Sequence, residues 1–311
     1  MRVSNRSLAS LGAVTGVVAV AVFIAPAATA APPLVAAPAA TSVAADWAPA
    51  DSAAIRPGVV TESAGGGACT SNFVFTSGDR TFIGQAAHCA GTGEATETNG
   101  CDSGTGPLGT AVTILAADGT ERAGTLAYSS WVTMQENGEA DPDTCQFNDF
   151  ALVEIAPEDV VDVNPSIPFF GGPVGLDTDG LPAGEQVFSY GNSPLRLGIE
   201  QLSPKVGVSA GDTGGGFSHE VYTVTPGVPG DSGSAFLDGD GDAVGILSTL
   251  NLAPLPVSNG VADLALALAY ANEFGGVGDI ALVPGTEAFS ALPAGVPLTA
   301  VSPPAGPPVN G

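Results

Sequence analysis

The feature that most constrains this sequence is a series of short β-type runs separated by Gly, Asn, Asp and Pro. Short strands at regular spacing, with turn residues between them, predict an all-β barrel or sandwich. One helix is predicted at Asp263–Phe274, because two glycines follow it as a stop signal. The alternating residues Val261–Ala267 leave the start of that helix open. The β-type runs are Asn72–Thr76, Arg80–Ala87, Leu108–Ala116, Ala123–Ser129, Phe150–Ile155, Gln186–Tyr190, Glu220–Thr225, Ser232–Leu237 and Ala243–Thr249.

The two ends of the chain differ from its middle. Residues 1–30 have a basic start, an apolar stretch and the small residues Ala28-Thr29-Ala30, which is the pattern of a secretory signal peptide. A signal anchor is the alternative, but the apolar stretch is short for a bilayer span. We expect residues 31–54 to be a flexible leader or short propeptide, 55–283 the folded domain, and 284–311 a Pro/Ala-rich tail. The mature protein is then secreted and extracellular, outside the membrane.

The charge balance argues against one class of partner. The chain has 32 acidic residues and only 7 Lys and Arg, which gives a formal net charge of −25. Proteins that bind the phosphate backbone need clustered basic residues. We therefore expect no nucleic-acid partner.

Four cysteines, Cys69, Cys89, Cys101 and Cys145, lie in the part of the chain expected to be exported. Cysteines in an oxidising compartment usually form disulfides. Four cysteines allow three pairings, and the residues by themselves do not choose among them.

Three short segments, QAAHC, NDFALVEI and PGDSGS, contain residue types that catalyse acyl transfer. A serine hydroxyl is a poor nucleophile and needs a base that titrates near neutrality, which His88 offers to Ser232. The imidazole needs a buried carboxylate to hold its tautomer. Asp149 directly precedes an apolar strand, whereas Asp141 and Asp143 lie in a polar stretch. Asp149 is therefore the expected partner of the histidine.

In this order, the segments resemble blocks of the chymotrypsin-like (trypsin-fold) serine peptidases, including secreted bacterial ones. The TAAHC-type and GDSGG-type blocks of that family match here as QAAHC and GDSGS. The resemblance covers Ile55 to Gly276. It implies two six-stranded antiparallel β-barrels with a C-terminal helix. It also implies a monomeric endopeptidase that acts on peptides or proteins without a cofactor or metal ion.

The resemblance assigns roles to individual residues. Ser232 is the nucleophile, His88 the general base, and Asp149 the group that orients the histidine. The backbone N–H groups of Gly230 and Ser232 form the oxyanion hole. Asp231 is buried beside the nucleophile, and a freed amine at Ile55 is a hypothetical partner for it.

The same resemblance pairs the cysteine after the histidine with one about twenty residues upstream. This implies a Cys69–Cys89 disulfide and leaves Cys101 to pair with Cys145.

Substrate specificity is also read from the resemblance. Pro226 stands where the base of the specificity pocket is expected, and it carries no charge to attract Arg or Lys. Substrate is expected to pair as an added strand with the backbone from Ser248 to Leu250. Leu250 replaces the glycine that is common in the family, which argues against a deep pocket. A small or apolar residue before the scissile bond is therefore expected.

Two other function classes remain open. One is a catalytically silent secreted binding domain with the same fold. The other is a secreted serine esterase; an α/β-hydrolase esterase needs a G-x-S-x-G elbow and the order Ser, acid, His, and neither is present. His219, the second histidine, is expected on a strand surface or in a hydrogen-bonded pair.

Overall fold

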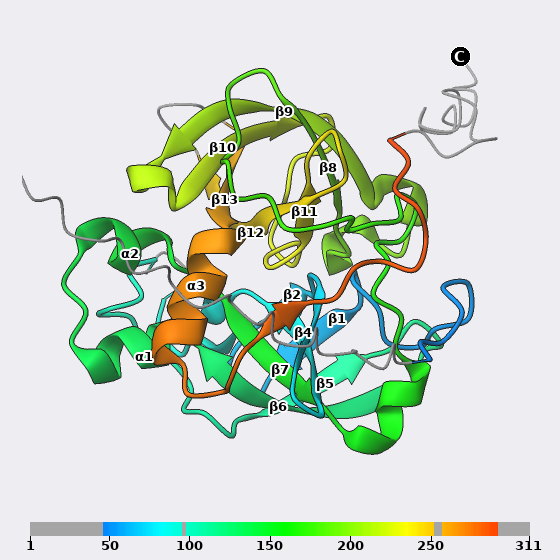
Figure 1. Cartoon of the computed structure of the whole chain (residues 1–311), viewed down its shortest axis with the longest axis horizontal. Helices are drawn as coiled ribbons and strands as arrows, with labels where there is room; N and C mark the ends of the chain where they lie inside the picture. The colour runs from blue at the N-terminus through cyan, green and yellow to red at the C-terminus, as the bar shows by residue number, and fades with distance from the viewer. Residues whose placement is uncertain (1–45, 95–97, 252–256, 292–311) are drawn as a thin grey trace, which may run out of the picture. The chain divides into compact units, whose positions relative to one another are not determined.

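The structure is a computed structural model that describes residues 46–94, 98–251 and 257–291 (Figure 1). The predicted signal peptide, most of the leader and the end of the tail lie outside these residues. No helix within the described ranges is both long and apolar enough to cross a membrane.

The first half of the chain forms one antiparallel sheet of eight strands, in the order β14-β3-β4-β7-β6-β5-β1-β2. Six strands were expected. The sheet is larger because β1 pairs with both β2 and β5, and because β14, from the end of the chain, adds to the edge at β3. Its strands are β1 (Val60–Ser63), β2 (Ala68–Thr70), β3 (Val74–Ser77), β4 (Arg80–Gln85), β5 (Ala111–Leu115), β6 (Glu121–Ser129), β7 (Ala151–Ile155) and β14 (Ala281–Leu282).

The second half forms a closed barrel of six antiparallel strands, in the order β10-β13-β12-β11-β8-β9. The expected all-β class, with a closed six-stranded barrel and a C-terminal helix, is confirmed. The barrel strands are β8 (Gln186–Tyr190), β9 (Pro204–Thr213), β10 (Ser218–Thr223), β11 (Ala235–Leu237), β12 (Ala243–Asn251) and β13 (Ser258–Asp263).

Three α-helices accompany the sheets in the part of the chain that the structure describes. Helix α3 (Leu264–Phe274) begins at the predicted place, because Asp263 caps it by accepting a hydrogen bond from the Leu266 N–H. Helix α1 (Ser130–Asn137) and helix α2 (Pro142–Phe147) were not predicted. In α2, Asp141 caps the first turn and Pro142 follows, which is a recognisable start signal. Short 3₁₀ helices are η1 (Ala87–Ala90), η2 (Pro157–Asp162), η3 (Pro194–Arg196), η4 (Glu200–Leu202) and η5 (Gly214–Gly216).

Aromatic side chains join the two sheets into one core. Phe75, Phe82 and Phe150 of the first half pack in the same buried cluster as Phe188 of the barrel and Leu268 of α3. One further apolar cluster packs against the first sheet, and another lies in the interior of the barrel. Helix α3 directly follows the last barrel strand and contacts α1 of the first half (Figure 1). It therefore connects the two halves.

The folded region is wider than the expected range 55–283. Ala53 and Ala54, placed in the leader, are 3% and 5% exposed. Phe289, placed in the tail, packs edge-on against Phe188 at 5.4 Å between ring centroids. Both segments were expected to be loose because they lack a periodic apolar pattern, but each contributes single side chains to a core built by other elements.

Candidate active site

The sheet topology brings His88 and Asp149 together. Strand β4 ends at Gln85 and pairs antiparallel with β7, in which Ala151 lies opposite Gln85. The residues just after β4 and just before β7 therefore meet at one end of the sheet. There the His88 Nδ1 lies 2.6 Å from Asp149 Oδ2, and the His88 backbone N–H donates to Asp149 Oδ1 at 2.9 Å.

The Asp149 carboxylate is buried and well supplied with donors. It is 4% exposed, and the Ser248 hydroxyl adds a third hydrogen bond to Oδ2 at 2.6 Å. Ser248 lies where the β12–β13 register shifts, and such a bulge redirects a side chain. Burial lowers the pKa of His88, but the negative charge of Asp149 and its hydrogen bond outweigh burial and raise that pKa above its ordinary value of 6.5.

Ser232 directly follows one tight turn and lies in a second. The Asp231 N–H donates to the Val228 carbonyl at 2.8 Å, with Pro229 and Gly230 at the central positions. The Ser234 N–H then donates to the Asp231 carbonyl at 3.0 Å. Proline followed by glycine is typical of a type II turn, whose third residue needs a positive φ, and Gly230 has φ 96°. A Cβ at this glycine would lie 2.7 Å from Pro194, so no larger residue fits without rearrangement.

These turns leave two particular N–H groups unoccupied. Within the described part of the chain, the N–H groups of Gly230 and Ser232 have no hydrogen-bond acceptor, whereas those of Asp231, Gly233 and Ser234 each have one. Two neighbouring unpaired backbone donors are the arrangement needed to bind a developing oxyanion.

Asp231 is fully buried and serves as counter-ion to two bases. Its carboxylate bonds to Arg196 and lies 3.2 Å from the Nζ of Lys205, which is 0% exposed. Burial raises the pKa of Asp231, but the charges of Lys205 and Arg196 outweigh it and lower the pKa below its usual value. Burial lowers the pKa of Lys205 to about 8. The two bases were missed from sequence, although they are among only 7 Lys and Arg in the chain.

The hypothetical partner Ile55 does not meet Asp231 in this structure. The Ile55 N–H donates to the Asp162 carbonyl at 3.1 Å, and the residue pairs with Val163. Arg196 and Lys205 occupy the place beside Asp231, so a freed chain terminus is not needed to neutralise it.

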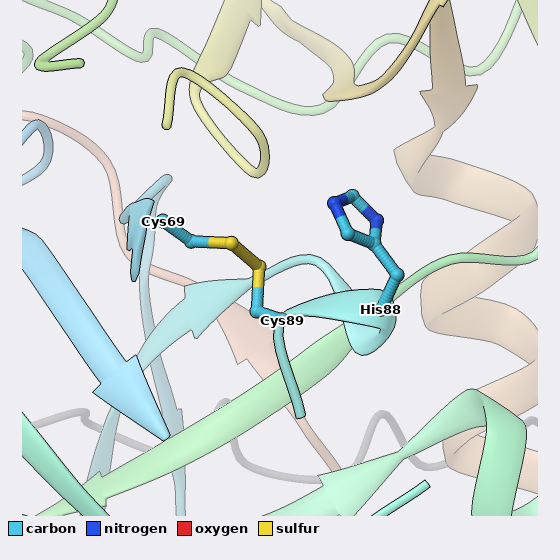
Figure 2. A group of neighbouring side chains, drawn as sticks. All are labelled: Cys69, His88 and Cys89. Carbon is cyan, nitrogen blue, oxygen red and sulfur yellow. A yellow bond between two sulfur atoms is a disulfide. The ribbon is translucent and has the colours of Figure 1, made fainter. Parts of the chain in front are cut away.

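The disulfides are Cys69–Cys89 and Cys101–Cys145, with S–S distances of 2.03 and 1.99 Å. The predicted pairing is confirmed. Figure 2 shows the imidazole of His88 and the sulfur of Cys89 extending from the same short helix, η1. The ligand atoms of Cys69, His88 and Cys89 lie within 4.8 Å of one another. Both sulfurs are bonded to each other, however, and so are not thiolates that could bind a metal ion.

His88, Asp149 and Ser232 line one cleft of about 820 Å³. The Ser232 hydroxyl makes no hydrogen bond to His88 within the described residues, although both side chains belong to this cleft. A larger cavity, of about 1280 Å³, contains none of the three.

The predicted specificity residues separate in the structure. Ser248 and Leu250 line the cleft, and Leu250 is 41% exposed. Pro226 is not among the lining residues; its carbonyl accepts a hydrogen bond from Arg196 Nη2 at 3.3 Å. The wall is formed instead by Gly227 and Val228, together with Leu247. A count of residues back from the serine does not reveal which backbone segment faces the cleft.

His219 lies outside the cleft. It is fully buried between two carboxylates, with Nδ1 2.7 Å from Asp212 and Nε2 3.0 Å from Asp263. Burial lowers the pKa of His219, but its hydrogen bonds to Asp263 and Asp212 outweigh burial and raise it. The expectation of a surface position is wrong, while that of a hydrogen-bonded histidine is confirmed.

No protein-family model and no curated protein matches the sequence. Solved structures do match. The chain is similar to Thermobifida fusca protease A, with 20% identity and a TM-score of 0.47 over 75% of this chain and 100% of that one. It is also similar to the Nocardiopsis protease, with 19% identity and a TM-score of 0.42 over 73% and 98%. Cellulomonas bogoriensis chymotrypsin gives 16% identity and a TM-score of 0.42 over 74% and 99%. The first two of these structures are named as proteases and the third as a chymotrypsin.

Proposed function

We propose that this protein is a secreted serine endopeptidase in which Ser232, His88 and Asp149 act as a catalytic triad. The observation that carries the proposal is that His88, bonded to the buried Asp149 carboxylate, lines one cleft with Ser232, where the backbone N–H groups of Gly230 and Ser232 are free within the described residues. A histidine held by a buried carboxylate has its Nε2 available as a base. The serine, base and oxyanion donors are the parts that acyl transfer requires.

In the proposed acylation step, Ser232 Oγ attacks the carbonyl carbon of the scissile peptide, and its proton passes to His88 Nε2. The N–H groups of Gly230 and Ser232 stabilise the oxyanion. His88 then gives the proton to the leaving amine as the C–N bond breaks, which leaves an acyl ester on Ser232. Water attacks this ester as His88 takes a proton from it, and His88 then returns that proton to Ser232 Oγ as the ester bond breaks and the acid is released. The serine–histidine hydrogen bond forms with substrate, since such contacts are often long in a free enzyme.

The proposed substrate strand lies along β12. Strand β11 pairs with β12 only as far as Ile246, so the edge from Ser248 to Leu250 has no partner strand on that side within the described residues. An extended peptide can add to such an edge through main-chain hydrogen bonds. For the residue before the scissile bond, called P1, we propose a small or apolar side chain, because Gly227, Val228 and Leu247 line the cleft nearby.

The test is covalent labelling with a serine-reactive fluorophosphonate, together with hydrolysis of peptide and ester substrates. We expect the wild-type protein to label and to cleave peptides, and Ser232→Ala to do neither. Ser234→Ala is the matched control, because the hydroxyl of Ser234 is buried and labelling should persist.

Absence of labelling in the wild type, with no hydrolysis, would favour the silent binding domain. Labelling with ester hydrolysis but no peptide cleavage would favour the esterase. A digest of an unstructured protein reads P1, and predominant cleavage after Lys or Arg would overturn the proposed preference.

A further inference from the structure

The Glu220 carboxylate lies in the cleft and has no basic partner among the described residues. Glu220, on β10, is half-buried and lines the cleft that contains Ser232 and His88. Its oxygens accept hydrogen bonds from the Asn251 amide at 2.9 Å and from the Ser258 hydroxyl at 2.7 Å. Both donors are neutral, so they hold the carboxylate in place without cancelling its charge.

The described part of the chain supplies no base to this position. Five of its 7 Lys and Arg lie between residues 46 and 291, and none of them lines the cleft. Each is engaged elsewhere: Arg56 with the Ala50 carbonyl, Arg80 with Glu154, Arg122 with Asp118, Asp159 and Asp162, and Arg196 and Lys205 with Asp231. No base among the described residues is therefore left to pair with Glu220, and a substrate can bring one.

The side of the sheet on which Glu220 lies determines which substrate residues it faces. Its neighbour Val221 belongs to the apolar interior of the barrel, so Glu220 points outward. Glu220 lies opposite Gly260 on β13, and Gly260 lies opposite Thr249 on β12. These residues share one face, because directly paired residues project to the same side of a sheet.

A substrate strand on β12 continues this alternation. The substrate residues that precede P1 are called P2, P3 and P4, counted toward the substrate N-terminus. With P1 beside Ser248, P2 lies beside Thr249 and P4 lies beside Asn251. The amide of Asn251 donates to Glu220. The side chains of P2 and P4 then project on the face of Thr249 and Glu220, while that of P3 projects on the opposite face.

We infer that Glu220 is a specificity-determining residue that selects substrates with a Lys or Arg side chain on the P2/P4 face. This inference rests on the proposed endopeptidase function. The glycine at position 260 favours it, because a Cβ there would lie 2.4 Å from the Thr249 hydroxyl and would stand between the substrate strand and the carboxylate. The basic group of the substrate supplies the counter-ion that Glu220 lacks among the described residues.

The experiment measures kcat/KM for fluorogenic peptides with alanine at P1. Lysine is compared with norleucine at P2, P3 or P4, in wild type, Glu220→Gln and Glu220→Lys. We expect lysine at P2 or P4 to raise kcat/KM roughly fivefold in the wild type, the upper end of an exposed ion pair. The gain should vanish in Glu220→Gln and reverse in Glu220→Lys. Lysine at P3 is the internal control, and Glu121→Gln, an exposed carboxylate outside the cleft, is the matched variant.

A purely structural role for Glu220 gives a different result. If the carboxylate only positions Asn251 and Ser258, Glu220→Gln lowers kcat/KM equally for all peptides, and the inference is overturned. A wild type without preference at P2 and P4 overturns it as well. Should the variant not fold, the salt dependence of the wild-type preference decides, because an ionic preference weakens as salt rises and an apolar one does not. If no peptide is cleaved and the fluorophosphonate does not label Ser232, the proposed function itself has failed.

Discussion

Among the buried acids described, Asp231 should be the one whose replacement lowers the stability of the fold most, and the variant Asp231→Asn tests this prediction. The carboxylate is 0% exposed and neutralises Arg196 and Lys205, which are 9% and 0% exposed. It also accepts hydrogen bonds from the N–H groups of Ser193 at 3.0 Å and Val228 at 3.1 Å. An asparagine keeps the shape but leaves two buried cations without a counter-ion.

Removing one partner of a buried ion pair costs about 3–5 kcal/mol, because the remaining charge is neither paired nor hydrated. For a domain of this size, each 1 kcal/mol lowers Tm by about 2–4 °C. Thermal unfolding at pH 7, followed by circular dichroism in a Ser232→Ala background that prevents self-cleavage, should therefore show a loss of roughly 6–20 °C. The double variant Asp231→Asn with Lys205→Met should recover part of that loss, because one uncompensated cation is removed.

The matched control is Asp238→Asn. Asp238 is 7% exposed, but it accepts only backbone hydrogen bonds, from Asp240 and Asp242, and forms no ion pair within the described residues. An amide oxygen can replace it at a cost of about 1 kcal/mol or less. Equal losses for Asp231→Asn and Asp238→Asn would refute the counter-ion argument.

The pH dependence adds a second check. The pKa of Asp231 is lower in the folded protein than its usual 3.8, so the ionised carboxylate stabilises the fold above that pH. The advantage of the wild type over Asp231→Asn should shrink as pH falls below 3.8 through the lowered folded-state pKa.

Three further predictions concern the catalytic groups and the second disulfide. Asp149→Asn should lower kcat about 10⁴-fold with little change in KM, since the histidine tautomer is lost, and steady-state kinetics would show otherwise if Asp149 only supports the fold. Because the pKa of His88 is raised above 6.5 and catalysis needs its neutral form, kcat/KM should fall as pH falls, with a midpoint above 6.5; a pH–rate profile with a lower midpoint would contradict this. Replacing Cys101 and Cys145 by alanine opens a loop of 44 residues and should cost about 4 kcal/mol in denaturant unfolding, whereas an unchanged midpoint would show that the disulfide adds no stability.

Local patterns predicted the parts of the site that depend on short segments. The turn around Ser232 could be recognised because proline and glycine encode its backbone angles directly. The pairing of Cys69 with Cys89 came only from the resemblance to a known family, because the residues by themselves allow three pairings. Pro226 shows the limit of such reasoning. Its distance in sequence from the serine suggested a place in the cleft, but the turn directs Gly227 and Val228 there instead.

The sequence by itself predicted nine of the strands, the helix after Asp263 and the residue types that line the cleft, because alternation, capping and turn chemistry act over a few neighbouring positions. It did not predict β1, β2, β9, β13 or β14. Only the tertiary structure decided which charged side chains surround the cleft. Arg196 and Lys205 reach Asp231 because β9 pairs with β8 and η3 folds back over the turn, and Glu220 reaches the cleft through the outward face of β10. Which carboxylate receives a base and which stays without one depends on long-range strand pairing, and no local pattern encodes that pairing.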